Sequence, residues 1–440
     1  MLKESKGRYK DMKTSTERII ELINASPSPY HAVENAEKIL KENGYVRLAA
    51  GADGNDAPRK FYITRTGVTG ECGSAIVAVR LPEGENREAV KPCGLHVVSA
   101  HTDSPCFRLK PNAVMDNGVY CRLNTERYGG AIWSTWLDRP LAIAGRVIYE
   151  RDGQLCSENV ALDGNVVIPN VAIHMNRQLN DGYSYNAASD LVPLWGGKGT
   201  GKAFTEKLCR AAGCEEDQLL DYDLAVYNPA EGMVWGGENE FFSSPRIDDL
   251  QCAFAGLFGL IQAEAPKNYA SVLALFDCEE VGSSCISGAD SDLLRLVAEK
   301  VAAATGTTVA ELEAGSFMLS ADNGHALHPN HPEYCDPTNR PVLGGGILLK
   351  YNTTKRYITD GESGAYVRFL CKKNGIPFQT FANRSDMLGG STLGNISGTQ
   401  FAIQGADIGL AQLAMHSSYE TAACADTDAM VSLTKVFFEL

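Results

Sequence analysis

The sequence predicts an α/β protein whose main domain is interrupted by a β-rich insertion. First, the chain has 440 residues, more than the roughly 250–300 at which a single hydrophobic core stops growing, so we expect two domains. Second, short apolar runs alternate with stretches of helical periodicity before residue 106 and after residue 244. Third, the part between them is rich in Gly, Asn and short β-like runs. We therefore expect one domain formed by residues 1–105 and 245–440, and a second domain inserted at 106–244.

The elements before the insertion are expected to be two helices followed by two buried strands. Apolar residues at helical spacing mark the helices, which a Ser-Pro-Ser-Pro breaker separates, and short apolar runs mark the strands. The ranges are 15–25 and 32–42 for the helices, and 75–79 and 96–100 for the strands. The second strand runs directly into His101, and the carboxyl ends of strands are where open α/β sheets bind their ligands.

The insertion and the chain after it are interpreted by the same criteria. Within the insertion, β-like runs occupy 145–149 and 165–168. After residue 245 the alternation of helices and strands returns. The expected helices are 248–264, a stretch near 291–304 and 363–374, and the expected strands are 271–276, 346–351 and 377–381.

Composition and charge exclude several classes of function. The chain is 44% hydrophobic and 21% charged, and no apolar run is long enough to cross a bilayer, so a membrane protein is not expected. The N-terminal segment lacks the apolar core and the cleavage site of a secretory signal, which predicts a cytoplasmic protein. A net charge of −14 repels polyanions, so nucleic acid is not an expected partner.

The cysteines point to free thiols. Thirteen are present, an odd number at scattered positions and without a CxxC pair. That spacing argues against a disulfide framework and against a zinc ribbon. Any metal site is therefore expected to use histidines and carboxylates.

Candidate metal ligands stand at the predicted ends of several elements. His101 and Asp103 follow a strand with one residue between them, so the carboxylate can orient the imidazole at a zinc ion; a polar strand end is the alternative. Asp248 and Asp249 begin an apolar helix, where free amides and the helix dipole favour negative charge. We interpret Asp249 as a helix cap and leave Asp248 open between capping and metal binding.

Glu279 and Glu280 give the sharpest local signal, because these adjacent carboxylates follow the apolar strand at 271–276. Hydrolysis at a bound metal needs one carboxylate as a ligand and another, unligated, that takes a proton from water. Adjacent glutamates can supply both. A solvated acidic loop is the alternative, and composition alone favours it.

Two further segments complete the candidate set. Asp322 follows an apolar stretch and is expected to be a ligand, and His416 precedes a C-terminal helix. Three histidines after Asp322 are instead expected to hydrogen-bond locally: His325, His328 and His331. A lone histidine such as His416 is more often structural, but two cations that share one carboxylate need a mixture of nitrogen and oxygen donors. That mixture is offered by His101, Asp248, Glu280, Asp322 and His416.

Taken in order, the motifs of the chain resemble those of the M18 aminopeptidases, the group of aspartyl aminopeptidase and vacuolar aminopeptidase I. The likeness spans nearly the whole sequence. It is carried by the segments 26–33 (SPSPYHAV), 99–105 (SAHTDSP), 128–130 (YGG), 136–139 (WLDR), 168–174, 244–248 (SPRID), 279–283 (EEVGS), 320–330 (SADNGHALHPN) and 413–417 (LAMHS). So many matches in the same order make coincidence implausible.

The resemblance implies a role for each candidate at the centre. The enzyme would hold two divalent metal ions, zinc by preference, with cobalt or manganese as alternatives. His101 and His416 would each bind one ion, Asp248 would bridge them, and Glu280 and Asp322 would complete the two ligand sets. Two more residues would act beside the metals: Glu279 as the general base, and Asp103 as the group that orients His101.

The resemblance also implies a fold and an assembly. The family has a zinc-peptidase-like α/β catalytic domain interrupted by a β-rich dimerisation domain, and its dimers gather into a tetrahedral dodecamer that encloses the active sites. In such assemblies a histidine of the insertion reaches the active site of a neighbouring subunit. His174 would be that residue, although from the sequence alone it is a structural histidine.

The expected substrates are peptides, and three residues are candidates for contact with them. In the aspartyl members a lysine on the strand after the Asp322-type motif lies near the substrate side chain. In this chain that strand is expected at 346–351, and Lys350 stands on it, where it could pair with an acidic P1 residue. Asp360 would add a negative charge nearby. The other two candidates are Tyr357 and Gly390, the latter in a loop that resembles the family's substrate-backbone loop.

We therefore expect a two-metal aminopeptidase that removes N-terminal residues, with a preference for Asp or Glu at even odds. Other members of the family prefer leucine or lysine, so a neutral or basic P1 preference is one alternative. A metal-dependent deacylase of small amides is a second. A non-catalytic assembly protein is a third, and the complete ligand set with Glu279 argues against it.

Overall fold

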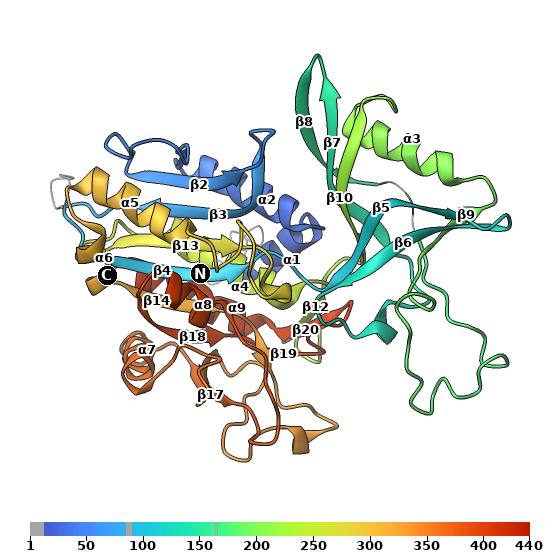
Figure 1. Cartoon of the computed structure of the whole chain (residues 1–440). Helices are drawn as coiled ribbons and strands as arrows, with labels where there is room; N and C mark the ends of the chain where they lie inside the picture. The colour runs from blue at the N-terminus through green and yellow to red at the C-terminus, as the bar shows by residue number, and fades with distance from the viewer. Residues whose placement is uncertain (1–12, 85–89, 163, 165) are drawn as a thin grey trace, which may run out of the picture.

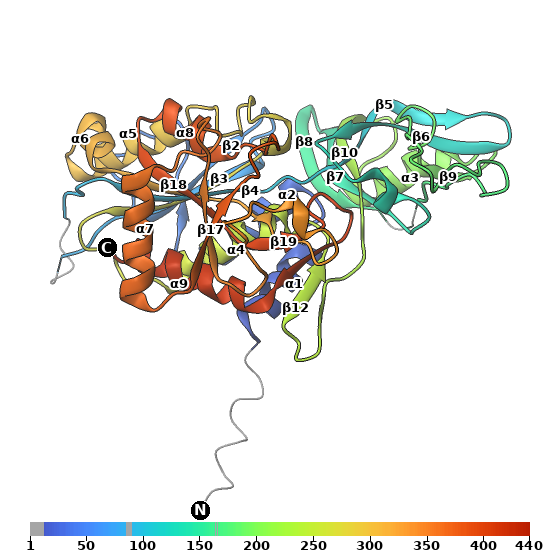
Figure 2. The same cartoon turned by 90° about the horizontal axis from the view of Figure 1, so that it is seen from below.

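The computed structural model describes residues 13–84, 90–162, 164 and 166–440. Two lobes lie side by side (Figures 1 and 2). The larger lobe contains a nine-stranded sheet covered by helices, and the smaller one contains a six-stranded sheet with a single long helix beside it. A small five-stranded sheet belongs to neither of these sheets.

The nine-stranded sheet runs in the order β1-β2-β3-β13-β4-β14-β18-β16-β17. Its strands are β1 (Val46–Arg47), β2 (Lys60–Thr66), β3 (Cys72–Arg80), β4 (Leu95–His101), β13 (Ala270–Phe276), β14 (Phe317–Ala321), β16 (Ile347–Tyr351), β17 (Phe378–Ala382) and β18 (Gln404–Gly409). The central strands β13, β4, β14 and β18 are parallel, and every residue of β4 and β13 is buried. Such strands are mostly apolar because helices cover both faces of the sheet.

Helices cover the two faces of this sheet with two separate cores (Figure 2). One face packs against α1 (Ser15–Asn24), α2 (Pro29–Glu42), α4 (Ile247–Gln262), α7 (Gly361–Asn374) and α9 (Cys424–Phe438). The other face packs against α5 (Leu293–Thr305), α6 (Val309–Gly315) and α8 (Leu393–Gln400). The helices and strands predicted outside the insertion are confirmed, with ends that differ by a few residues.

The six-stranded sheet is antiparallel and runs in the order β8-β7-β10-β5-β6-β9. Its elements are β5 (Cys106–Asp116), β6 (Tyr120–Tyr128), β7 (Ala142–Arg151), β8 (Gln154–Ala161), β9 (Leu194–Gly197), β10 (Leu219–Tyr227) and the helix α3 (Gly201–Ala212). The strand predicted at 145–149 is β7. The strand predicted at 165–168 is wrong: Asn165 lies outside the described residues, and Val166 to Ile168 make only isolated bridges to other segments.

The small sheet brings distant parts of the chain together near the junction of the lobes. Its strands are β11 (Met233–Trp235), β12 (Phe241–Ser244), β15 (Gly324–His325), β19 (Ala411–Leu413) and β20 (Glu420–Ala423). β11 and β12 fall within the range predicted for the insertion, yet β12 pairs with β20 near the C-terminus. Three short 3-10 helices complete the structure: η1 (Trp133–Trp136), η2 (Glu279–Val281) and η3 (Pro332–Tyr334).

Two expectations from composition can be compared with the structure. Among the described residues, no helix combines the length and the apolar character that a membrane span requires. The side chains of twelve cysteines are described, and all twelve are free thiols, as predicted. The absence of a secretory signal was predicted from the N-terminal segment, of which residues 1–12 lie outside the described residues.

Candidate metal centre

The candidate site lies at the carboxyl ends of three neighbouring parallel strands. His101 is the last residue of β4, Asp322 directly follows β14, and Glu279 and Glu280 form the turn η2 soon after β13. β4 lies between β13 and β14 in the sheet. Parallel strands place their carboxyl ends at one edge, so these ionisable side chains meet there. Asp248, at the start of α4, and His416, after β19, come to the same edge.

The six residues form three overlapping groups of possible ligand atoms. Within each group the atoms lie no more than 4.8 Å apart: His101, Asp248 and Asp322; His101, Glu279 and Glu280; Asp248, Glu280 and His416. The structure thus brings together all five residues predicted as ligands, along with Glu279. Asp248 belongs to two groups that contain different histidines, which is the position of a carboxylate shared between two cations.

The hydrogen bonds of the two histidines leave one ring nitrogen of each available. Nδ1 of His101 lies 3.0 Å from the main-chain oxygen of Asp103, and Nδ1 of His416 lies 3.1 Å from that of Gly130. A carbonyl oxygen only accepts, so both Nδ1 atoms carry a proton, and Nε2 is the atom of each neutral ring that could bind a metal ion. Those Nε2 atoms lie 3.4 and 3.3 Å from the two different oxygens of Asp248. One carboxylate therefore stands between the two imidazole nitrogens that face the site.

Unpaired buried oxygens show that this site fits cations. Asp248 Oδ1 and Glu280 Oε1 are buried and have no hydrogen-bond partner among the described residues. Buried polar atoms are nearly always paired, and an orphaned carboxylate oxygen carries a large desolvation cost. Nitrogen and oxygen donors arranged in this way suit zinc and similar divalent ions. The residues present therefore fit the metal that they were predicted to bind.

The protonation behaviour of the cluster reflects a surplus of negative charge. Burial, with nearby carboxylates, raises the pKa of Glu279 to about 8 and that of Asp322 to about 6, although His101 opposes the shift in both cases. Burial alone lowers the pKa of His101, but its contacts with Asp103 and Asp248 outweigh burial and raise it well above the usual value. Divalent cations would neutralise this surplus.

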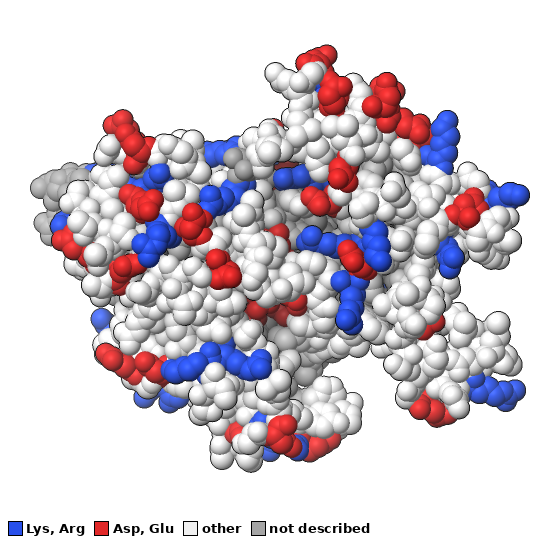
Figure 3. Space-filling view, viewed as in Figure 1, with Lys and Arg blue, Asp and Glu red and all other residues white. Residues whose placement is uncertain are grey.

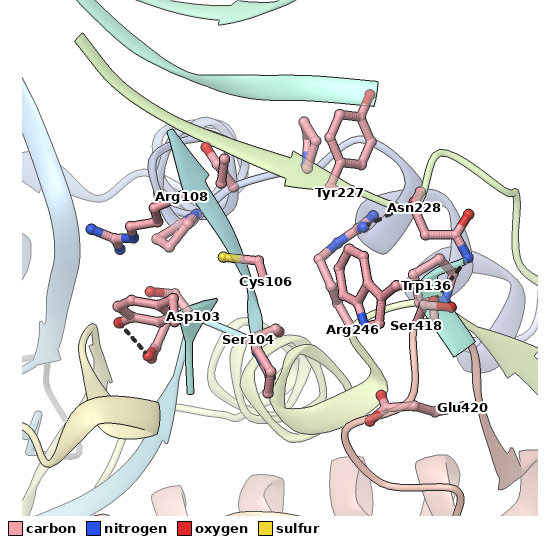
Figure 4. A pocket seen from close by; sticks show the side chains of 18 of the residues that line it. Asp103, Ser104, Cys106, Arg108, Trp136, Tyr227, Asn228, Arg246, Ser418 and Glu420 are labelled. Carbon is pink, nitrogen blue, oxygen red and sulfur yellow. Dashed lines mark hydrogen bonds between the residues drawn. The ribbon is translucent and has the colours of Figure 1, made fainter. Parts of the chain in front are cut away.

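Asp103 holds the Glu279–Glu280 turn in place. Its carboxylate accepts the main-chain N–H groups of Glu279 and Glu280, at 3.2 and 3.1 Å, and the hydroxyl of Tyr128 at 2.8 Å. Figure 4 shows Asp103 in the neighbouring pocket, with a hydrogen bond drawn as a dashed line. The same carboxylate lies 3.4 Å from Nδ1 of His101. The main-chain oxygen of Asp103 makes the shorter contact with that nitrogen. Asp103 therefore touches both the histidine that it was predicted to orient and the two glutamates.

Two further carboxylates support the centre and were not predicted to do so. Glu420 accepts the main-chain N–H groups of Asp248 and His416, at 3.1 and 2.7 Å. Asp249 Oδ2 accepts the N–H group of His101 at 3.2 Å, and Oδ1 has no hydrogen-bond partner among the described residues, so Asp249 does not cap α4 and that interpretation is wrong. Glu420 and Asp249 accept main-chain N–H groups, which every residue except proline offers, so the type of the partner residue gives no sequence signal. The only signal is that these carboxylates stand close to His416 and Asp248 in the sequence.

The cavity beside the metal cluster contains the predicted substrate contacts. Lys350, Tyr357 and Gly390 line it. So do Glu279 and four of the five predicted ligands, all except His101. Lys350 is buried; its ammonium donates to the main-chain oxygen of Asn323 at 2.7 Å and lies 3.4 Å from Asp322. In the space-filling view, acidic side chains lie recessed in the hollow between the lobes (Figure 3).

Other candidates lie outside this cavity. His174 is exposed on the long irregular segment at 169–193 and does not line the cavity of its own chain. Asp360 caps α7 by accepting the N–H of Ser363 at 2.8 Å, and it lines a different hollow, so it does not add charge beside Lys350. His328 and His331 make local hydrogen bonds, as predicted.

Comparisons with known proteins agree with this geometry. Residues 22–438 match the family model "Aminopeptidase I zinc metalloprotease (M18)". A probable M18 family aminopeptidase 2 of Clostridium novyi (strain NT) is 39% identical, over 96% of this chain and 98% of the relative. A crystal structure of prApe1 is 26% identical, with a TM-score of 0.88 and coverage of 96% and 94%. The S. cerevisiae mApe1 dodecamer is also 26% identical, with a TM-score of 0.80 and coverage of 96% and 95%.

These matches cover nearly the whole chain, and they include the segments that carry the metal cluster. The solved structures share the mixed α/β fold described above. Together with a cluster that fits divalent cations, they give the assignment. The chain belongs to the M18 family of zinc metalloproteases and is a metal-dependent aminopeptidase.

Proposed function

We propose that the protein is a two-metal aminopeptidase that removes N-terminal amino acids from peptides. The observation that carries this proposal is the placement of Asp248 between the free Nε2 atoms of His101 and His416. His101 with Asp322 would hold one ion, and His416 with Glu280 the other, with Asp248 shared between them. Glu279 is left as the unligated base.

The residues of the chain have distinct tasks in this mechanism. When bound, the metals supply Lewis acidity that favours deprotonation of water and polarises the scissile carbonyl. Glu279 takes the proton of the attacking water and returns it to the leaving amine. Asp103 fixes the main chain of Glu279 and so directs its carboxylate toward the reacting atoms. A base with a pKa near neutrality suits this exchange.

The first experiment tests metal and substrate together. The purified protein is stripped of metal, reloaded with zinc, cobalt or manganese, and assayed on aminoacyl anilides with Asp, Glu, Leu or Lys at P1. Each substrate is paired with its N-acetyl form. Cleavage of the free amines alone supports an aminopeptidase, whereas equal cleavage of the acetylated forms indicates a deacylase. No metal-dependent cleavage of either set contradicts the proposal and favours a non-catalytic assembly protein.

We propose further that an acidic P1 residue is preferred and that Lys350 reads it. An ammonium has three donors, and the described residues account for two of them at Asn323 and Asp322. The third is left for a substrate carboxylate in the cavity that Lys350 lines. A neutral or basic preference is the alternative, favoured by the fact that Asp322 already offsets the charge of Lys350.

We also propose that residues 106–244 form an inserted dimerisation domain and that the dimers assemble into a tetrahedral dodecamer. A dodecamer is described for the related S. cerevisiae protein. The exposed segment around His174 carries apolar side chains at alternate positions, namely Val171, Ile173 and Met175. Exposed apolar residues gathered in one segment are typical of a contact surface. His174 would then stabilise the oxyanion in the active site of a neighbouring subunit.

Mixed oligomers test this assignment of His174. The variants H174A and E279Q are each expected to be nearly inactive, because each lacks one of the two catalytic groups. When both subunits are unfolded, mixed and reassembled, sites that combine Glu279 of one subunit with His174 of another recover part of the activity. If His174 acted within its own chain, mixing would restore nothing. Mixing H174A subunits with H174A subunits is the matched control.

A further inference from the structure

Asp407 is a buried carboxylate behind the wall of the substrate cavity. It lies on β18, between β14 and β16 in the nine-stranded sheet, and none of its surface is exposed. It does not line the cavity and does not belong to any of the groups of possible metal ligands. A carboxylate in such a place needs hydrogen-bond partners, because an unpaired buried charge is strongly unfavourable.

The two oxygens of Asp407 accept hydrogen bonds from two different segments. Oδ1 accepts the hydroxyl of Thr392 at 2.6 Å, and Oδ2 accepts the main-chain N–H of Ile358 at 2.5 Å. The main-chain N–H of Asp407 donates to the hydroxyl of Thr359 at 2.7 Å. One residue therefore joins the segment around Ile358 to the segment that ends at Thr392.

Both of these segments form walls of the substrate cavity. Tyr357, next to Ile358, lines it from one segment, and three consecutive residues line it from the other: Gly390, Ser391 and Thr392. The charge of Asp407 also reaches Lys350, whose pKa burial would lower but nearby Asp322, Tyr357 and Asp407 raise. Asp407 is thus connected to cavity-lining residues of three segments, none of which is a proposed metal ligand.

Close packing at Gly394 shows that the second wall rests directly on Asp407. A Cβ atom added at Gly394 would come within 2.9 Å of Asp407 Oδ1 and of the side chain of Ser320. Real Cβ atoms do not come so close without a shift of their neighbours. Gly394 is the second residue of α8, which begins immediately after the cavity wall, so the absence of its side chain allows the wall to approach the carboxylate.

We infer that Asp407 is a positioning residue that ties the two walls together and so sets the shape of the pocket for the N-terminal side chain of the substrate. This inference rests on the proposed aminopeptidase function and adds a residue that lies outside the metal centre. In the variant D407N the side chain keeps one acceptor oxygen, and its second polar atom becomes an NH2 group. That NH2 group would face either the Thr392 hydroxyl or the Ile358 N–H and could not accept its hydrogen bond. One wall contact is then lost while the volume of the side chain stays the same.

The test compares D407N with D426N in the zinc-loaded protein. Asp426 is a matched control: it is equally buried, and its oxygens accept two N–H groups, from Gly344 and Gly346, at 2.8 and 2.7 Å, but neither glycine lines the cavity. For each variant, kcat and KM are measured on the aminoacyl anilide that the wild type cleaves best, together with the melting temperature and the zinc content.

We expect D407N to raise KM about tenfold, with kcat changed less than threefold and zinc content unchanged, because a loosened wall weakens ground-state and transition-state binding alike. D407N and D426N are expected to lower the melting temperature by similar amounts, because each loses one buried hydrogen bond. D426N is expected to leave KM unchanged. T392V, which removes the hydroxyl that donates to Asp407, should also raise KM.

Equal KM values for D407N, D426N and wild type would overturn the inference. So would a loss of zinc in D407N, because the effect would then arise at the metal centre. Failure of the proposed function is a separate result, since the wild type would then cleave none of the aminoacyl anilides.

Discussion

The two ends of strand β4 hold histidines in opposite environments. At the amino end, His96 is stacked between the rings of Tyr269 and Phe437, with ring centroids 3.8 and 4.3 Å away, and burial lowers its pKa to about 4. At the carboxyl end, His101 is just as buried, yet surrounding carboxylates raise its pKa well above the usual value. Residue type, strand and burial are the same. The neighbours alone make one end structural and the other chemical.

The largest expected effect would confirm that the carboxyl end carries the chemistry. E279Q removes the proposed base but keeps its volume, so kcat should fall about 10³-fold, within the range that general acid–base catalysis contributes. Zinc content should stay at the wild-type value, because the five ligands remain. Steady-state kinetics and elemental analysis measure the two quantities. Turnover within tenfold of the wild type would remove Glu279 from its role.

Metal removal should expose the repulsion among the carboxylates at this end. Without metal, Glu279 and Glu420 have pKa values of about 8, raised from 4.5 mainly by burial. The folded state therefore favours their protonated forms, and the resulting stability is present below pH 4.5 and lost as the pH rises toward 8. We expect the melting temperature of the stripped protein to fall between pH 5 and pH 8, and that of the zinc-loaded protein to change less. Parallel curves would contradict this.

A moderate effect is expected from the support beneath the metals. D103N leaves an amide where the carboxylate accepts the N–H groups of Glu279 and Glu280 and touches His101. Substitution of a partner that orients metal ligands typically costs 10- to 100-fold in metal affinity or activity, and we expect a loss of about that size in zinc affinity. Competition with a chelator measures it. Y128F, which removes only one hydrogen bond to Asp103, is the milder control.

The smallest effect belongs to the amino end of β4. Because the folded state keeps His96 neutral, the unfolded chain binds the extra proton, and stability is lost as the pH falls from 6.5 toward 4. H96F cannot take up this proton, so its loss of unfolding free energy between pH 6.5 and 5 should be smaller by about 1 kcal/mol. Denaturant unfolding at the two pH values measures it. H328F, at an exposed position, should behave like the wild type.

The sequence predicted the carboxyl end of β4 better than it predicted the supports around it. His101, Glu280 and Asp322 each follow an apolar run, and such a run ends where a buried strand reaches the sheet edge. Glu420 and Asp249 carry no comparable signal, because each binds main-chain amides of residues brought close only by the fold. Hydrogen bonds to distant amides leave no trace in local spacing.

The fold shows the same limit. The strand β18 was not predicted, since its residues 404–409 (QGADIG) include two glycines, a glutamine and Asp407, and only Ile408 is β-branched. The helix α3 lies within the insertion, whose composition predicts β structure, although Phe204, Leu208 and Ala212 place a buried stripe along one face of this helix. Both elements form because they pack against the rest of the sheet or lobe. This tertiary packing stabilises them where local propensity alone would not.

The order in which the metal ligands occur along the chain has a consequence for biosynthesis. His101 comes early and His416 comes close to the C-terminus, and Asp248 lies between their two Nε2 atoms. A nascent chain that has been synthesised through Asp248 but not as far as His416 therefore lacks one of the two imidazoles and cannot complete the proposed shared arrangement. Peptide cleavage at this centre is expected to begin only after His416 has been added and the chain has folded around it.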